Sequence, residues 1–405
     1  MSTEAPEKPR ERSAASVVQA IWSANTVTVT VLAIVAALLI GAVLIIVSDP
    51  DVLATYGYFT ARPSDALTGS WELVSEAYAN LFKGAIFDPE AASVTAAFRP
   101  ISETLTYAAP IVFTGLAVTL AFRGGLFNIG AQGQAVMGTI LAALAGFLIP
   151  LPIGVHLVVA LVAGAAGGAF WGFLPGILKA RFGAHEVITS IMLNYIAGLF
   201  LGWIIMQAGV HDPNRQDAIS KPVDASAQLP TLLGDQRVHL GIVLAALATW
   251  GVSWLLNRST FGFELRAVGA NPDAARTAGI SVTGTYTMLM VVSGGLAGLG
   301  GATQLLGTSY SLNPLVAGNI GFDGLLVALL GRGKPWGVLW AAILFGALRA
   351  GGNRMQSYAS VSLELVTVLQ ALIVIFIAAP ALVKAIFRLR AARAARLSTS
   401  IAKGW

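Results

Sequence analysis

Long apolar runs of about twenty residues follow one another along the chain, and they restrict its possible folds more than any other feature. At 1.5 Å per residue, a helix of about twenty residues spans the ~30 Å hydrocarbon core of a bilayer. Hydrophobic residues make up 56% of the chain and charged residues only 11%, whereas about a quarter of a soluble domain is charged. The sequence therefore predicts an all-α integral membrane protein.

The apolar runs predict about ten transmembrane helices, of which the eighth is unusually short. They cover residues 26–47, 103–122, 126–149, 154–178, 188–208, 238–256, 284–306, 322–330, 336–350 and 363–387. We expect a transmembrane region over 26–387, preceded by a cytoplasmic tail at 1–25. A basic cytoplasmic tail at 388–405 is expected to follow it.

The distribution of Lys and Arg predicts the orientation. If both termini are cytoplasmic, most of the 25 basic residues fall on the cytoplasmic side, as the positive-inside rule requires. Residues 48–101 then form a long extracytoplasmic segment, in which residues 71–86 are expected to be an amphipathic helix. Residues 257–283 form a cytoplasmic loop.

Several kinds of chemistry are excluded or disfavoured by residue content. The chain has no cysteine, and its four histidines lack the spacing of metal ligands, so no metal site is expected. ALLGRGKP (residues 328–335) lacks the first Gly of a Walker A loop and has Pro335 in place of its Ser or Thr. No catalytic motif is visible, and we expect a transport subunit and not an enzyme.

Glycines repeat at helical spacing within two of the runs. Gly164, Gly168 and Gly172 fall at i, i+4 and i+8, and Gly294 and Gly298 are spaced in the same way. Such faces allow two helix backbones to approach closely in a membrane. We expect them to pack helices within the chain.

Polar side chains at membrane depth indicate either pairing between helices or a wet path, because an unpaired polar group in hydrocarbon costs several kcal/mol. The stretch GLFNIGAQGQAVMG (residues 125–138) contributes Asn128 and Gln132, which would share one face of a helix, while Gln134 would point elsewhere. The predicted solute path comprises Phe127, Asn128, Gln132, Asn194, Tyr195 and Gln304. Buried carboxylates are nearly absent, which disfavours coupling to ions.

The loop at 257–283 contains a well-capped short helix. Asn271 is a good N-cap, Pro272 suits the first helical position, and Gly279 ends the helix. Because an isolated helix of two turns is marginal in water, we expect residues 272–278 to dock on this chain or on a partner. An ATP-binding subunit in trans would supply the energy that the chain itself cannot.

Four stretches resemble the permease subunits of bacterial ABC importers for branched-chain amino acids, ribose and nucleosides. They are GLFNIGAQGQAVMG, EVITSIMLNYIAG (186–198), AVGANPDAARTAGI (267–280) and the segment 321–352. The likeness is greatest to the longer of the two paralogous permeases of nucleoside-type systems. Gln132 stands where that family commonly has an acidic residue, and residues 48–101 are longer than expected.

The resemblance implies a nucleoside importer in the bacterial inner membrane that works by alternating access. It implies partner ABC ATPase subunits that bind ATP and Mg, a second permease subunit and a substrate-binding lipoprotein. It also assigns ATPase coupling to the residues of the capped helix, which are Asn271, Pro272, Asp273, Ala274, Ala275, Arg276 and Gly279. This chain itself would bind no cofactor and no nucleic acid.

Three alternatives stay open from the residues. The same machine could import ribose or another simple sugar. A secondary transporter or channel would act without an ATPase, and a scaffold protein would pair its polar residues helix to helix, without a cavity.

Overall fold

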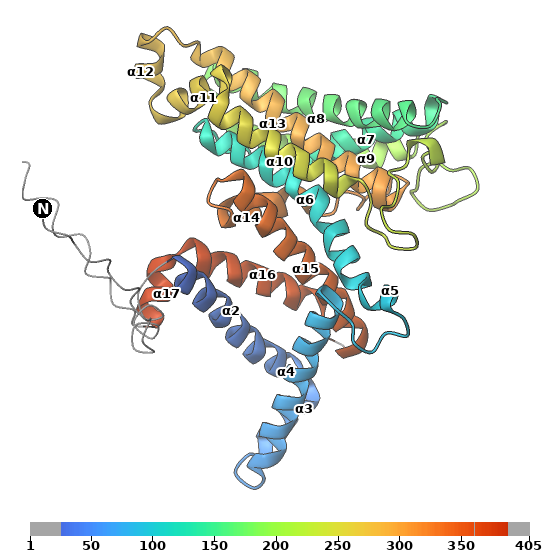
Figure 1. Ribbon diagram of the computed structural model, residues 1–405, viewed down its shortest axis with the longest axis vertical. Coiled ribbons are helices and arrows are strands. Elements are labelled where there is room, and N and C mark those ends of the chain that lie inside the picture. Colours follow the sequence, from blue (N-terminus) through green and yellow to red (C-terminus); the bar gives the residue numbers. More distant parts are fainter. Residues whose placement is uncertain (1–25, 360, 388–405) are drawn as a thin grey trace, which may run out of the picture. The chain divides into compact units, whose positions relative to one another are not determined.

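The computed structural model describes residues 26–359 and 361–387, which are helical through most of their length (Figure 1). The predicted tails at 1–25 and 388–405 lie outside the described residues. Within the described ranges, β-structure is limited to two isolated bridges. The all-α prediction is confirmed. The chain divides into two compact units, one formed by its two ends and one by residues 71–366.

The first unit, up to residue 70 and again from 367, contains the described N-terminal helices and the C-terminal end. Helix α2 (Thr26–Ser48) contacts α17 (Pro380–Ile386), and α3 (Pro50–Thr55) begins at Asp49, whose side chain accepts from two backbone N–H groups of its first turn. The expected single helix over 363–387 is wrong. Helix α16 (Leu363–Ala378) and α17 meet at 92°, because Pro380 has no N–H to continue the helix.

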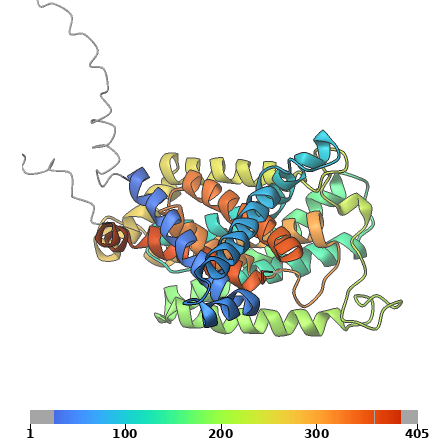
Figure 2. The ribbon, with the colours of Figure 1, turned by 90° about the horizontal axis from the view of Figure 1, so that it is seen from below.

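The second unit contains the remaining helices, which we give in chain order. They are most of α4 (Pro63–Ala85), α5 (Val94–Ala97), α6 (Arg99–Arg123), α7 (Ala131–Leu148), α8 (Val155–Phe182), α9 (Glu186–Ile205), α10 (Gly241–Arg258), α11 (Thr260–Ala270), α12 (Pro272–Thr277), α13 (Val282–Gln304), α14 (Ile320–Leu330) and α15 (Pro335–Ala359). Figure 2 shows α9 in lime green and α10 in yellow along opposite edges of this unit. The expected amphipathic helix at 71–86 is confirmed as the greater part of α4.

Glycine-lined backbones hold α8 against α13 in this unit. A Cβ atom added to Gly168 would lie 2.6 Å from the Gly298 Cα, and one added to Gly172 would lie 3.0 Å from the Gly294 Cα. No real Cβ tolerates the first of these distances, so the two helices touch through their main chains. The prediction that these glycines pack helices within the chain is confirmed, and α7 joins the same contact through Gly138, which faces Gly298.

Six of the described helices are long and apolar enough to cross a membrane, and the bent pair α16–α17 makes a seventh if it is one span. The expected ten spans are therefore not confirmed. Two expected boundaries are also wrong, because α7 begins at Ala131 and not at residue 126, and α15 continues to Ala359. The eighth expected segment is short, as predicted, and is α14 with 11 residues.

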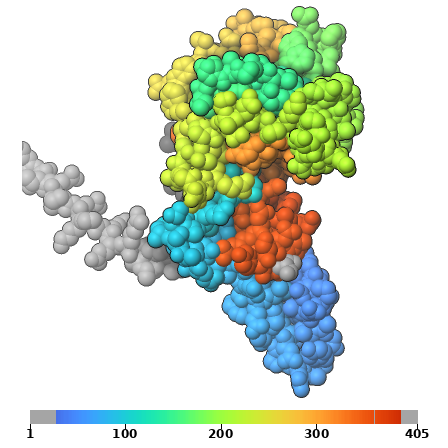
Figure 3. Space-filling model, turned by 90° about the vertical axis from the view of Figure 1, so that its right-hand side faces the viewer, coloured from blue at the N-terminus to red at the C-terminus, as the bar shows by residue number. Residues whose placement is uncertain are grey.

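The connection between α9 and α10 packs over one end of the second unit, as the view in Figure 3 shows. Its backbone N–H groups bond to the ends of the helices beneath, from Asp224 to the Gly146 carbonyl at 2.8 Å and from Leu229 to the Leu306 carbonyl at 2.8 Å. Val223, Ala227 and Leu229 are buried in the same apolar core as α7 and the end of α13. This connection is therefore an ordered part of the unit.

The contact between α8 and α13 leads to a first prediction. Gly168→Val should lower the thermal stability of the detergent-purified protein, because its side chain collides with the α13 backbone. Overpacking of this kind costs about 1–3 kcal/mol or more. Gly198→Val on α9 is the matched control, because no atom lies within 4 Å of a Cβ added there. Equal melting temperatures for the two variants would contradict the close contact.

Candidate functional site

The chain enters the helix bundle before α7 without helical structure. Residues 124–130 form turns and irregular backbone, and Asn128 in this lead-in segment is fully buried. Its Nδ2 donates to the Ser293 Oγ on α13 at 2.7 Å and to the Gln134 Oε1 at 2.9 Å, and the Gln134 Nε2 donates back at 3.1 Å. Ser293 in turn donates to the Ala117 carbonyl of α6 at 2.8 Å. The network ties the lead-in segment to three helices.

Asn194 on α9 holds the same segment from the other side. Its Nδ2 donates to the Ile129 carbonyl at 3.0 Å, and its Oδ1 accepts from the Gly133 N–H at 2.8 Å. Both backbone groups lie at the start of α7, where the first N–H groups of a helix lack partners within the helix. The single Asn194 side chain thus provides partners for one backbone donor and one backbone acceptor at the non-helical break before α7.

The expectation that Asn128 and Gln132 share a helix face is wrong, because α7 begins at Ala131 and Asn128 precedes it. The expectation that Gln134 points away is also wrong, because Gln134 pairs with Asn128. The cause is the non-helical backbone of residues 124–130, to which the helical period of four residues does not apply.

Gln132 joins α7 to the start of α14. Its Nε2 donates to the Gly318 carbonyl at 2.7 Å, and its Oε1 accepts from the Gly321 N–H at 2.9 Å. A Cβ on Gly321 would collide with the Gln132 backbone, so the first turns of the two helices are in direct contact. We call this meeting of α7 and α14 the half-helix junction.

The half-helix junction lies beside the interior of α6. The Thr114 Oγ1 donates to the Ile320 carbonyl at 2.7 Å, and Thr114 stands roughly 13 Å from Arg123 at the end of α6, at 1.5 Å per residue. The C-terminal end of α14 lies beside the C-terminal end of α6, since the Arg123 Nε donates to the Gly333 carbonyl at 2.9 Å. Helix α14 therefore spans about half of the depth of α6.

The structure brings five of the six predicted path residues close to one level. Phe127 is partly exposed and its ring lies 5.1 Å from that of Phe122, and Tyr195 follows Asn194 on α9 with an exposed side chain. Gln304 stands apart at the far end of α13, about 16 Å along the helix from Ser293. The set thus comprises one buried amide (Asn128), two half-buried amides (Gln132 and Asn194), two exposed aromatic side chains and one distant amide.

Three polar residues at this level were not among those predicted from the sequence. Thr114 and Ser293 are fully buried and bond across helices, and the Ser190 hydroxyl on α9 is buried without a hydrogen-bond partner among the described residues. Single hydroxyls are common in membrane helices, so no sequence signal marked them. The sequence did contain one signal for the break at this level. Pro314, Gly318 and Asn319, which favour turns, precede the short eighth apolar run.

The capped helix forms as predicted. Helix α12 begins at Asn271, whose Oδ1 accepts from the Asp273 and Ala274 N–H groups at 3.0 Å each. Gly279 ends it with φ +85°. Ala275 is buried against Val268 and Val282, so the helix docks on its own chain. Asn271, Asp273, Ala274, Arg276 and Gly279 stay exposed at this end of the unit.

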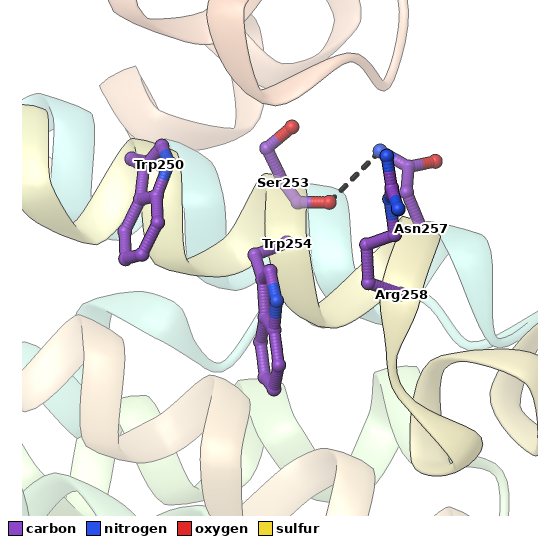
Figure 4. Close-up of a pocket in the computed structure, with 5 residues that line it drawn as sticks. All are labelled: Trp250, Ser253, Trp254, Asn257 and Arg258. Atoms are coloured by element: carbon purple, nitrogen blue, oxygen red, sulfur yellow. Dashed lines mark hydrogen bonds between the residues drawn. The ribbon is translucent and has the colours of Figure 1, made fainter.

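A surface pocket of about 570 Å³ lies along α10 and is lined by Trp250, Ser253, Trp254, Asn257 and Arg258. Figure 4 shows that all five residues come from this one helix, with the Asn257 Nδ2 donating to the Ser253 carbonyl at 2.8 Å. The pocket is therefore an open groove on a helix and not a cavity between helices. In the described part of the chain, no three His, Asp or Glu side chains lie close enough together to hold a metal ion.

Comparison with known proteins gives consistent matches. Residues 100–378 match the family described as branched-chain amino acid transport system / permease component. The guanosine ABC transporter permease NupP of Bacillus subtilis is 41% identical over 69% of this chain and 80% of its own length. The nucleoside permease NupB of Lactococcus lactis is 40% identical over 69% and 79%. The glucose permease TsgB13 of Haloferax volcanii is 32% identical over 68% and 75%. No solved structure matches the chain.

The buried amide network leads to a second prediction. Asn128→Leu should destabilise the purified protein by about 1–3 kcal/mol, because Gln134 and Ser293 lose a partner in a buried place. Asn257→Leu is the matched control, since that exposed amide bonds only to its own helix on α10. Thermal melting in detergent compares the two variants. A melting temperature for Asn128→Leu as high as that of the control would contradict a stabilising role for the network.

Proposed function

The chain belongs to the family of branched-chain amino acid transport system permease components, and we propose that it moves nucleosides across the membrane by alternating access. The relatives are permease subunits of ABC transporters, which are not themselves enzymes, and ATPase activity lies in a partner subunit. In the proposed cycle, the partner ATPases bind ATP and Mg, and their closure drives this chain between its two open states.

Two observations support a nucleoside over a sugar. The relatives named for guanosine and for nucleosides are 41% and 40% identical, against 32% for the one named for glucose. Phe127 and Tyr195 also expose aromatic rings near the half-helix junction, and bases stack on aromatic rings. Import of glucose, ribose or another simple sugar by the same machine is the second candidate, supported by the match to the glucose permease.

We further propose that both termini are cytoplasmic, that about ten segments cross or enter the membrane, and that this membrane is the bacterial inner membrane. The ion pairs support this arrangement. Asp88 pairs with Arg354, and Glu103 pairs with Arg237 at 2.8 Å, and the charge distribution assigns all four residues to the outer side. The hydrogen bond from Arg354 holds the pKa of the Asp88 carboxyl below its usual value.

Helix α12 is the proposed contact with the ATPase. It lies at the end of the second unit that the charge distribution assigns to the cytoplasm, and its Asn271, Pro272, Asp273, Ala274, Arg276 and Gly279 stand around an exposed surface, while Ala275 faces its own chain. A helix that packs on its own chain through one face and exposes the other can insert the exposed face into a groove of a partner subunit. A second permease subunit and a substrate-binding lipoprotein complete the proposed assembly.

The substrate proposal leads to a third prediction. Cells that express this chain with its partners should take up labelled guanosine, and unlabelled guanosine should compete far better than glucose or ribose. Competition by glucose but not by guanosine would replace the nucleoside proposal by the sugar one. Uptake by the purified chain alone in liposomes, driven by an ion gradient, would exclude the ABC mechanism.

The coupling proposal leads to a fourth prediction. Ala274→Trp should abolish co-purification of the ATPase and guanosine uptake, because the bulky ring occupies the exposed face of α12. Ala225→Trp makes the same substitution at an exposed site in the connection between α9 and α10, and it should leave ATPase co-purification intact. Retention of the ATPase by Ala274→Trp would overturn the assignment of α12.

A further inference from the structure

The segment before α14 crosses half the depth of the second unit without helical structure. At one end, the Leu312 N–H donates to the Ser220 Oγ at 2.8 Å and the Tyr310 carbonyl accepts from the Val223 N–H at 2.8 Å. Both partners belong to the connection that packs over the helix ends. At the other end, Ile320 is bonded to Thr114 in the interior of α6. Residues 311–319 therefore run as turns and irregular backbone from the end of the bundle to its middle.

Part of this segment is exposed on the surface of the chain. Leu315 is 82% exposed and Phe322, in the first turn of α14, is 42% exposed. Gly318 and Asn319 between them are also exposed. Gly318 has φ +46°, so its backbone follows a course open mainly to glycine.

Such a surface is incompatible with lipid. Irregular backbone occurs at membrane depth only where protein buries it or where it lines a water-filled cavity, because lipid offers no hydrogen-bond partners. On the buried side of the segment, the Gln132 side chain provides hydrogen-bond partners for the Gly318 carbonyl and the Gly321 N–H. No described residue of the second unit gives the exposed side such cover, and this holds whichever end of the bundle faces the cytoplasm.

We propose that the surface formed by Leu315, Gly318, Asn319 and Phe322 is a wall of the aqueous translocation path and touches the solute. We call it the junction wall. The proposal rests on the transport function proposed above, and it adds a solute contact that lies outside the polar stretch at 125–138. The opposite wall would come from the second permease subunit.

The chemistry of the junction wall suits a neutral, polar solute with a flat apolar part. The Asn319 amide can donate and accept, and the Gly318 carbonyl keeps one lone pair beyond its bond to Gln132. Leu315 and Phe322 add apolar surface on either side. No cation lies among these four residues, which fits an uncharged nucleoside or sugar better than an anion.

Cysteine accessibility tests this proposal directly, because the chain contains no cysteine of its own. The variants are Asn319→Cys and Leu315→Cys, each in the complex with its partner subunits in membrane vesicles, probed with a charged methanethiosulfonate reagent. Labelling of each variant after denaturation in SDS measures its total amount of reactive cysteine, to which the labelling of the native complex is normalised. Leu247→Cys is the control, since Leu247 is 57% exposed but lies on the regular helix α10.

Both junction variants should label about tenfold faster than the control, because the reacting thiolate forms only where water reaches it. Guanosine should slow their labelling and leave that of the control unchanged. Labelling no faster than the control at both positions would overturn the proposal. Fast labelling that neither guanosine nor glucose slows would overturn the solute contact. Protection by glucose alone would uphold the junction wall and overturn only the nucleoside assignment.

Discussion

Every backbone N–H and C=O group at membrane depth needs a partner within the protein, and the interior of the second unit is arranged around meeting this requirement at two breaks. The chain is non-helical before α7 and again before α14, and the two breaks meet at the half-helix junction. Gln132 serves both with one amide, accepting from Gly321 and donating to Gly318. Asn128 and Asn194 complete the arrangement at the first break. The polar residues that look like solute ligands in the sequence are thus first the means by which broken helices persist in a membrane.

The glycine contacts provide the rigid surroundings of these breaks. Helices α7, α8 and α13 touch through their main chains at Gly138, Gly168 and Gly298, and at these positions there is no room for a side chain between them. The lead-in segment is bonded to this group through Ser293 of α13. The break before α7 is thus fastened directly to a closely packed group of helices.

The sequence predicted what depends on local chemistry and missed what depends on distant contacts. The capped helix α12 was predictable because Asn271, Pro272 and Gly279 act within a few residues of one another. The start of α7 was not, because the apolar composition of 126–149 is the same whether its first turn is helical or extended. The pairing of Asn128 with Gln134 follows from that break and could not be read from helical spacing. Gln132 was predicted to line the solute path, and its hydrogen-bond partners, Gly318 and Gly321, could not be foreseen because they lie far along the chain.

Helix α12 is fastened to its own chain by Ala275, which packs on Val282 in the first turn of α13. Helix α13 then runs the length of the second unit, ends in a π-helical turn at Leu305–Ser309, and continues through Tyr310, with φ +56°, into the segment that descends to the half-helix junction. One uninterrupted stretch of chain thus leads from the exposed cap to the middle of the bundle. Under the proposed coupling role of α12, a push or pull there would pass through the packing of Ala275 on Val282 to α13, and beyond α13 the chain loses helical structure in the segment that carries Asn319.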